Sequence, residues 1–233
     1  MIKLVLYRYL KKKIKTVIHN YINTKYWDFY YKKHRDCKDP SSFAQYCYEK
    51  YFAQSEGKML LELGCGNGRD SLYFMNKNLN VMGLDIVNKQ LKYLNSKYKC
   101  NNMIFKCVDF SQYSKPDFYD YIYSRFTLHA ITEEQELDTL ANSFKNLKAN
   151  GLFFIEVRSI KDDMYKKSYK LSETETKTDH YRRFAIYDKL LDRIHNVGFE
   201  ILESVESQGL AKYKDEDPCV IRIVAKKCMY DNI

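Results

Sequence analysis

The chain of 233 residues is 45% hydrophobic and 30% charged, a composition typical of a soluble globular protein with one substantial core. No apolar run reaches the roughly 20 residues needed to span a bilayer, and the basic N-terminus lacks the apolar segment and cleavage site of a secretory signal. The seven cysteines are scattered, odd in number and without a C-x-x-C pair. That pattern argues against a disulfide framework and against zinc, and we expect reduced thiols and a cytoplasmic location.

The net charge of +9 is concentrated at the N-terminus, where residues 1–20 hold six lysines and arginines and no acid. The rest of the chain is only mildly basic, which makes nucleic acid an unlikely partner. Apolar residues recur at helical spacing, so residues 1–22 are predicted to form a basic amphipathic helix, separate from a domain over 23–233. This helix either packs on the domain with a solvated basic face or contacts an anionic membrane surface or a partner protein through residues 1–20.

Residues 24–56 are rich in tyrosine and phenylalanine, and we expect them to form helices that cover a ligand crevice or pack in the core. Pro40-Ser41-Ser42 predicts a turn followed by a helix start. From Lys58 onward, apolar strand-like segments alternate with helix-like segments, which indicates an α/β fold with a parallel sheet. Strands are predicted near 58–63, 80–85, 102–108, 118–124, 151–157, 199–205 and 219–226, and helices near 68–77, 88–98, 133–147 and 184–196.

Three further features refine this organisation. Gly151 and Gly198 are predicted to stop helices just before strands. The final two strands have no helix between them and are predicted to form an antiparallel hairpin. Residues 158–182 are polar and follow the fifth strand, so they are either a lid over the ligand edge of the sheet or a disordered surface loop.

The segment after the first strand carries three glycines at alternate positions, Gly64, Gly66 and Gly68, in a tight turn that lets backbone approach a ligand closely. A second strand ends at Asp85, about where a carboxylate would hold a ribose diol in a βαβ unit. The glycine spacing differs from the G-x-G-x-x-G of dinucleotide-binding proteins.

With Glu62 added, these residues match the motif E-x-G-x-G-x-G, and the chain resembles the class I S-adenosylmethionine-dependent methyltransferases. The resemblance implies a Rossmann-like, seven-stranded, mostly parallel sheet with helices on both faces and an antiparallel last strand. It also implies that the cofactor is S-adenosylmethionine. The glycines would meet its methionine part, and Glu62 would hold the glycine loop or the methionine amino group. Further residues would line the nucleoside: Asp85 at the ribose, Ile86 at the adenine face, Asp109 at the adenine amino group unless it only caps the next turn, and Phe110 and Ser124.

The fourth strand ends in Ser124-Arg125-Phe126-Thr127-Leu128-His129, beside the place where the methyl group reacts in this family. The N/D-P-P-Y/F motif of base-methylating enzymes is absent here, which counts against base methylation. Basic and polar groups on three segments could bind phosphate or carboxylate, or could serve only in surface ion pairs, for instance with Asp215, Glu216 and Asp217. The candidate acceptor-binding residues are Arg158, Tyr181, Arg182 and Arg183, and the candidate catalytic residues are Arg125, His129 and His180. Either histidine could act as a general base, or the acceptor oxygen could already be anionic and need none.

A narrower resemblance rests on the runs around Arg125, on Glu156–Asp163, on His180–Phe184 and on Asp215–Pro218. These runs are similar to bacterial methyltransferases of capsule biosynthesis, some from pathways of O-methyl phosphoramidate decoration. The resemblance implies methyl transfer to an oxygen of a small anionic acceptor. Two alternatives stay open: an RNA methyltransferase that uses the basic N-terminus, and a non-catalytic cofactor-binding regulator at a membrane.

Overall fold

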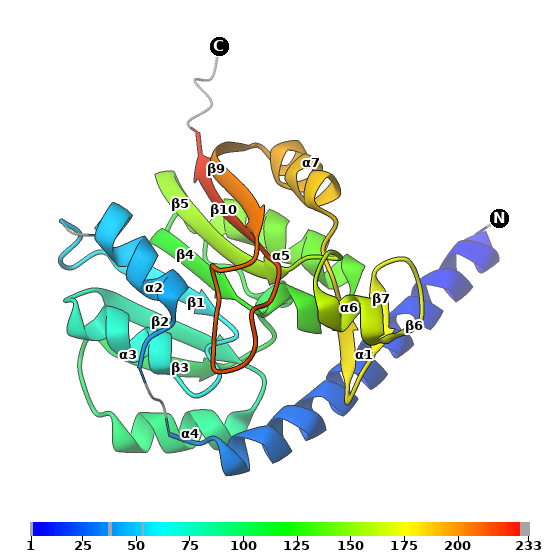
Figure 1. The fold of residues 1–233 in the computed structure, drawn as a ribbon, viewed down its shortest axis with the longest axis horizontal. Helices are drawn as coiled ribbons and strands as arrows, with labels where there is room; N and C mark the ends of the chain where they lie inside the picture. The colour runs from blue at the N-terminus through cyan, green and yellow to red at the C-terminus, as the bar shows by residue number, and fades with distance from the viewer. Residues whose placement is uncertain (1, 37–38, 53, 229–233) are drawn as a thin grey trace.

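The computed structural model describes residues 2–36, 39–52 and 54–228, with side chains described from Val17 onward. Within this part of the chain the main sheet has seven strands in the order β3-β2-β1-β4-β5-β10-β9 (Figure 1). β10 is antiparallel to both of its neighbours, whereas β1 to β5 are parallel. The predicted α/β fold with an antiparallel last strand is therefore confirmed. The strands are β1 (Met59–Leu63), β2 (Asn80–Asp85), β3 (Met103–Cys107), β4 (Tyr119–Arg125), β5 (Leu147–Arg158), β9 (Phe199–Ser207) and β10 (Val220–Lys227).

The register of the parallel strands brings the predicted site residues to one edge of the sheet. The last residue of β1 is level with Leu84 on β2 and with Ser124 on β4. Gly64, Asp85 and Arg125 therefore lie at the carboxyl ends of three adjacent strands. This is the edge at which open α/β sheets bind their ligands.

Two apolar clusters cover the two faces of the sheet, because alternate strand residues point to opposite sides. Leu60 and Tyr123 pack against α2 (Ser42–Cys47), α3 (Arg69–Asn76) and α4 (Asn88–Lys97). Leu61 and Ile122 pack against α5 (Glu133–Asn146) and α7 (Tyr187–Val197). The predicted helix start at Pro40–Ser42 is confirmed, since the Ser41 side chain caps α2 by accepting from the Ala44 N–H.

The N-terminal helix α1 (Ile2–Lys33) is longer than predicted. It continues well past residue 22 because no glycine or proline occurs before Pro40 to break it. Figure 1 shows it as a long rod that runs from the neighbourhood of α4 to the small strands β6 (Tyr169–Lys170) and β7 (Glu175–Lys177). Among the described residues, no helix is both long and apolar enough to cross a membrane.

The polar stretch after β5 is ordered, so the alternative of a disordered loop is wrong. It forms α6 (Asp163–Lys167) and a small antiparallel sheet of β6, β7 and β8 (Tyr181–Arg183). A second correction concerns Gly151, which lies inside β5, because α5 already ends at Asn146 and the strand starts at Leu147. Gly198 does end α7, in the left-handed conformation.

Candidate active site

The glycine loop joins β1 to α3 in a conformation that side chains disfavour. Gly64, Gly66 and Gly68 have φ of 67°, 55° and 78°, all in the left-handed region open to glycine. Space is also lacking, because a Cβ on Gly64 would lie 2.1 Å from the Thr127 methyl group. The loop is closed by the Gly68 N–H, which donates to the Cys65 carbonyl at 2.8 Å. The motif therefore builds a backbone turn pressed against the end of β4.

Asp85 ends β2 beside this loop, as predicted. Its carboxylate accepts from the N–H groups of Gly66 and Val87, each at 3.0 Å. Burial raises the pKa of Asp85, and these two hydrogen bonds oppose the rise. Within the described residues it has no ion-pair partner, so its oxygens keep capacity for further hydroxyl donors. Ile86 follows it and is half-buried.

Asp109 both caps a turn and contacts the N-terminal helix. One carboxylate oxygen accepts from the Ser111 N–H at 3.0 Å, which confirms the capping alternative. The other accepts from the side-chain amide of Asn20 on α1 at 2.8 Å. Phe110 is buried and lies 3.6 Å from the position a Cβ on Gly64 would take, so it belongs to the wall of the loop.

Glu62 is a buried carboxylate on β1, directly beneath the glycine loop. It accepts a hydrogen bond from Ser71 at the start of α3. Burial, with the nearby charge of Asp70, raises the pKa of Glu62 to about 8. Because the described residues give it no ion-pair partner, a cationic group of a ligand placed nearby would favour its ionised form.

The end of β4 supplies the opposite wall of the site. Ser124 is fully buried and its hydroxyl is bonded to that of Thr127. Phe126 has a φ of 56°, an uncommon conformation for a bulky residue and one often found at functional sites. Its ring lies 4.3 Å from the guanidinium carbon of Arg125 and 5.4 Å from that of Arg158.

The arginines at this wall are paired with acids. Arg125 Nε lies 2.8 Å from Glu156, whose second oxygen accepts from Arg222 at 2.7 Å. Arg158 binds Asp162 at 3.1 Å and Glu216 at 2.9 Å. Both arginines therefore form ion pairs, which was the predicted alternative to binding an anionic ligand. Glu216 is one of the acids that the sequence analysis named as a partner.

Two buried histidines face the same wall. Burial, followed by the positive charges of Arg182 and Arg158, holds the pKa of His129 well below its usual range. Burial and Arg182 likewise lower the pKa of His180 to about 4. Both imidazoles are therefore neutral at pH 7. Among the described residues, His129 Nδ1 and His180 Nε2 find no hydrogen-bond partner.

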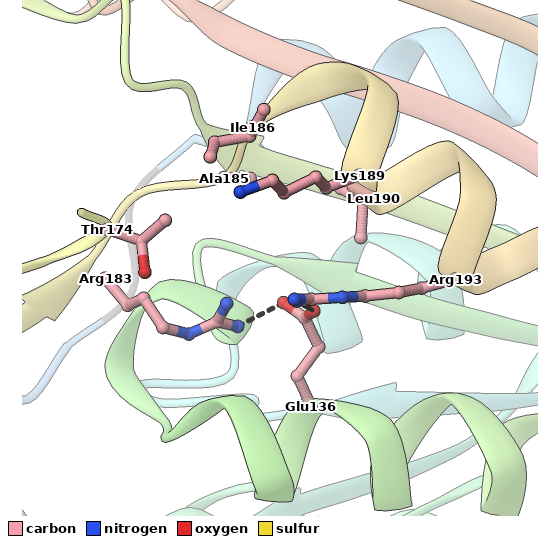
Figure 2. A pocket seen from close by; sticks show the side chains of 8 residues that line it. All are labelled: Glu136, Thr174, Arg183, Ala185, Ile186, Lys189, Leu190 and Arg193. Carbon is pink, nitrogen blue, oxygen red and sulfur yellow. Dashed lines mark hydrogen bonds and ion pairs between the residues drawn. The ribbon is translucent and has the colours of Figure 1, made fainter. Parts of the chain in front are cut away.

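The structure places Arg183 and Tyr181 apart from Arg158 and Arg182, the other two residues that were predicted to bind the acceptor. Arg183 points between α5 and α7, where Glu136 binds both it and Arg193 (Figure 2). Tyr181 donates to Glu175 at 2.8 Å and packs edge-on against His19 of α1. Successive residues of a strand point to opposite sides, so Arg183 and Arg182 cannot share one site. The prediction that Arg183 joins the acceptor site is therefore not supported by its position.

Residues 60–151 match the family model described as a methyltransferase domain. The matched segment runs from β1 into β5 and contains the glycine loop, Asp85 and the wall at the end of β4. This protein is an S-adenosylmethionine-dependent methyltransferase. A comparison of the methyltransferase sequence with curated proteins gives no match.

Solved structures with the same fold include an S-adenosylmethionine-dependent methyltransferase from Methanosarcina mazei, at 16% identity and a TM-score of 0.67, covering 76% of this chain and 95% of that one. The 1,6-didemethyltoxoflavin-N1-methyltransferase from Burkholderia thailandensis, solved with 1,6-didemethyltoxoflavin and S-adenosylhomocysteine, is 16% identical with a TM-score of 0.62 over 80% and 77%. The cyclase SpnF is 16% identical with a TM-score of 0.64 over 80% of each chain. Such similarity shows the fold and leaves the acceptor open.

The observed site fits S-adenosylmethionine, the cofactor of this methyltransferase. The loop offers close-approaching backbone, Asp85 offers oxygens for a diol, and Glu62 offers a carboxylate without an ion-pair partner for an ammonium group. When bound, the cofactor supplies a methyl group on a positively charged sulfur. The assignment of individual contacts to Asp85, Ile86 and Asp109 stays a prediction.

Sequence analysis missed the residues that α1 brings to this site. Asn20 binds Asp109, and the Tyr31 hydroxyl lies 2.6 Å from where a Cβ on Gly66 would be. The aromatic density of residues 24–56 was the available signal, and it predicted a cover over the crevice. It could not single out Tyr31, because one aromatic residue among many on a helix has no distinguishing pattern.

Proposed function

We propose that this methyltransferase acts on an oxygen of a small anionic acceptor, phosphate-like or phosphoramidate-like, in the biosynthesis of a capsule or surface polysaccharide. The main support is a group of buried polar atoms without partners. The described residues hold five such atoms, on Arg125, His129, Glu156, Arg158 and His180. Those on Arg125 and Glu156 face each other as an ion pair. The other three are nitrogens of His129, Arg158 and His180.

Buried nitrogens without partners are costly in a folded protein. Here they gather in one neighbourhood, because Arg158 and His180 are both close enough to His129 to lower its pKa. The charged groups with the largest effects on His129 include Arg182, Arg158 and Arg125. An anionic oxygen placed among them would accept hydrogen bonds and meet a favourable field.

A cavity of about 420 Å³ beside Arg158 is large enough to hold a small acceptor. It lies between the lid, which contributes α6 and Thr178, and the loop before β10. Acidic side chains also line it, Asp215 and Glu216 among them. An acceptor whose anionic group meets Arg158 and whose remainder carries hydroxyl donors would satisfy both halves of this lining.

Each site residue then has a proposed role. Arg158 and Arg182 would hold the anionic group, and Arg125, fixed by Glu156, would orient the strand end. A neutral His129 or His180 would accept a proton where the acceptor oxygen carries one. Where the oxygen is already anionic, alignment of the two reactants is the main contribution of the protein.

The test is turnover with S-adenosylmethionine and a panel of sugar phosphates and phosphoramidates, each paired with its neutral alcohol. We expect S-adenosylhomocysteine to form with an anionic member and not with its neutral partner. Equal turnover of the neutral partner, or turnover of RNA alone, would overturn the proposal. The RNA alternative has less support, because the base-methylation motif is absent and the excess charge lies in residues 1–20.

A further inference from the structure

The inner side of α1 lies against the cofactor site at two separated points. Asn20 donates to Asp109 at 2.8 Å. Three turns further along the helix, the Tyr31 hydroxyl sits over the glycine loop, 2.6 Å from the position a Cβ on Gly66 would take. Burial, followed by the charge of Asp85, raises the pKa of Tyr31 well above its ordinary value, so its hydroxyl stays a hydrogen-bond donor.

The same stretch of α1 also packs against the acceptor side. The Tyr26 ring stacks on His180 with 4.0 Å between ring centroids, and its hydroxyl donates to Asp179 at 2.5 Å. Trp27 meets His180 edge-on at 5.3 Å. Trp27 also stacks on Tyr31 at 5.9 Å with 24° between the ring planes. Packed rings therefore connect the glycine loop to His180 without a gap.

We propose that α1 from Asn20 to Tyr31 is a common wall of the cofactor and acceptor sites. In this wall Tyr31 contacts the bound cofactor, and Trp27 couples the position of Tyr31 to that of His180. A cofactor that packs against Tyr31 fixes the helix, and the helix fixes His180, so the anionic acceptor binds more tightly once the cofactor is present. The acceptor half of this inference rests on the proposed function. The Tyr31 half does not.

The chain offers a direct probe, because Trp27 is its only tryptophan. We expect S-adenosylhomocysteine to change Trp27 emission in a saturable way, with the dissociation constant that calorimetry gives. Calorimetric saturation without any change in emission would overturn the proposal.

Tyr31→Phe removes the Tyr31 atom that lies nearest to the glycine loop and keeps the ring. It should weaken S-adenosylhomocysteine binding roughly tenfold, the scale of one buried hydrogen bond. Tyr30→Phe is the matched control, since it removes the same atom from the exposed neighbour and should leave the affinity unchanged. Equal affinities of the two variants would contradict a role for Tyr31.

Coupling is measured with inorganic phosphate as the acceptor probe. In the wild-type protein, saturating S-adenosylhomocysteine should tighten phosphate binding roughly tenfold, and in Tyr31→Phe much less. If the phosphate affinity is the same with and without S-adenosylhomocysteine, the proposal of a common wall is wrong, while the proposed function is unaffected. If phosphate fails to bind in either state, the proposed anion site is wrong, while the emission and Tyr31→Phe results still decide the role of Tyr31.

Discussion

Asp85 illustrates how one side chain can organise a loop and keep capacity for a ligand. It accepts from two backbone N–H groups, and no basic residue described here neutralises it. An asparagine keeps the shape and one acceptor oxygen but loses the charge. We expect Asp85→Asn to weaken S-adenosylhomocysteine binding by about 1.5–3 kcal/mol, the range for hydrogen bonds to charged groups, as measured by calorimetry.

The control for Asp85→Asn is Asp120→Asn at the opposite end of the sheet. Asp120 also accepts from a backbone N–H, that of Met59, at 2.9 Å. Its replacement should cost some stability and leave cofactor affinity unchanged. Equal losses of affinity in both variants would point to general destabilisation instead of a role for Asp85.

Glu62 makes folding depend on pH in a direction opposite to that of most carboxylates. Its pKa is raised from the ordinary 4.5 to about 8 by burial and by Asp70. Below pH 4.5 it is protonated in both states, and as the pH rises towards 8 only the unfolded chain ionises, so stability falls. Glu62→Gln should remove this loss, so its melting temperature should exceed that of the wild type by a margin that grows from pH 5 to pH 8.

Glu134→Gln, an exposed change on α5, is the control for the pH series. It should follow the wild-type curve. If Glu62→Gln also follows that curve, Glu62 is ionised in the folded protein and the proposed effect of burial is wrong.

At the scale of elements, the short strand β8 directs the side chains of two neighbouring arginines, Arg182 and Arg183, to opposite sides. Arg182 lies near Asp179 and Thr178, on the side of His180. We expect Arg182→Met to raise the acceptor KM roughly tenfold, as for a lost charged hydrogen bond, with cofactor affinity unchanged. Steady-state kinetics with the best anionic acceptor checks this, and an unchanged KM would remove Arg182 from the acceptor site.

Arg183 instead ties the small sheet of β6, β7 and β8 to α5 through Glu136, as Figure 2 shows. Removal of one partner from a buried ion pair costs several kcal/mol, because the other charge stays buried. Arg193 still neutralises Glu136, so we expect Arg183→Met to cost about 3 kcal/mol, at the low end of that range. Urea unfolding measures this, and Lys189→Met, which removes a more exposed cation nearby, should cost far less.

The elements themselves were largely predictable, because burial on both faces gives parallel strands an apolar sequence that stands out. The strand ends, the glycine loop and Asp85 followed from that pattern. The small three-stranded sheet did not, since β6, β7 and β8 are only two or three residues long and polar. Without β8, no periodicity could tell Arg182 from Arg183. The ring contacts of α1 with His180 were equally hidden, because they join residues about 150 positions apart.

At the scale of the whole molecule, the excess positive charge lies in residues 1–20 of α1. Among the side chains that the structure describes, from Val17 onward, the first contacts of α1 with the sites come from His19 and Asn20. Val17, Ile18, Tyr21 and Ile22 are exposed on its outer side. A basic helix with exposed apolar residues suits an anionic membrane surface, and the predicted membrane contact through residues 1–20 stays a proposal.

Deletion of residues 2–15 removes the six basic residues and should abolish sedimentation with anionic lipid vesicles while cofactor affinity stays the same. Neutral vesicles are the control, because the electrostatic attraction to anionic lipid is then absent. Salt-sensitive retention on RNA that disappears with the same deletion, without any vesicle binding, would favour the RNA alternative instead.

The position of β10 has a consequence for how the protein is made. Among the described residues it is the last strand in chain order, yet it lies between β5 and β9, and within that part of the chain β9 pairs with β10 alone. On the ribosome, β9 must therefore wait for residues 220–227 to emerge before it can pair at all. A chain that terminates before Val220 leaves one edge of β5 unpaired, and a strand from another molecule can then pair with that edge.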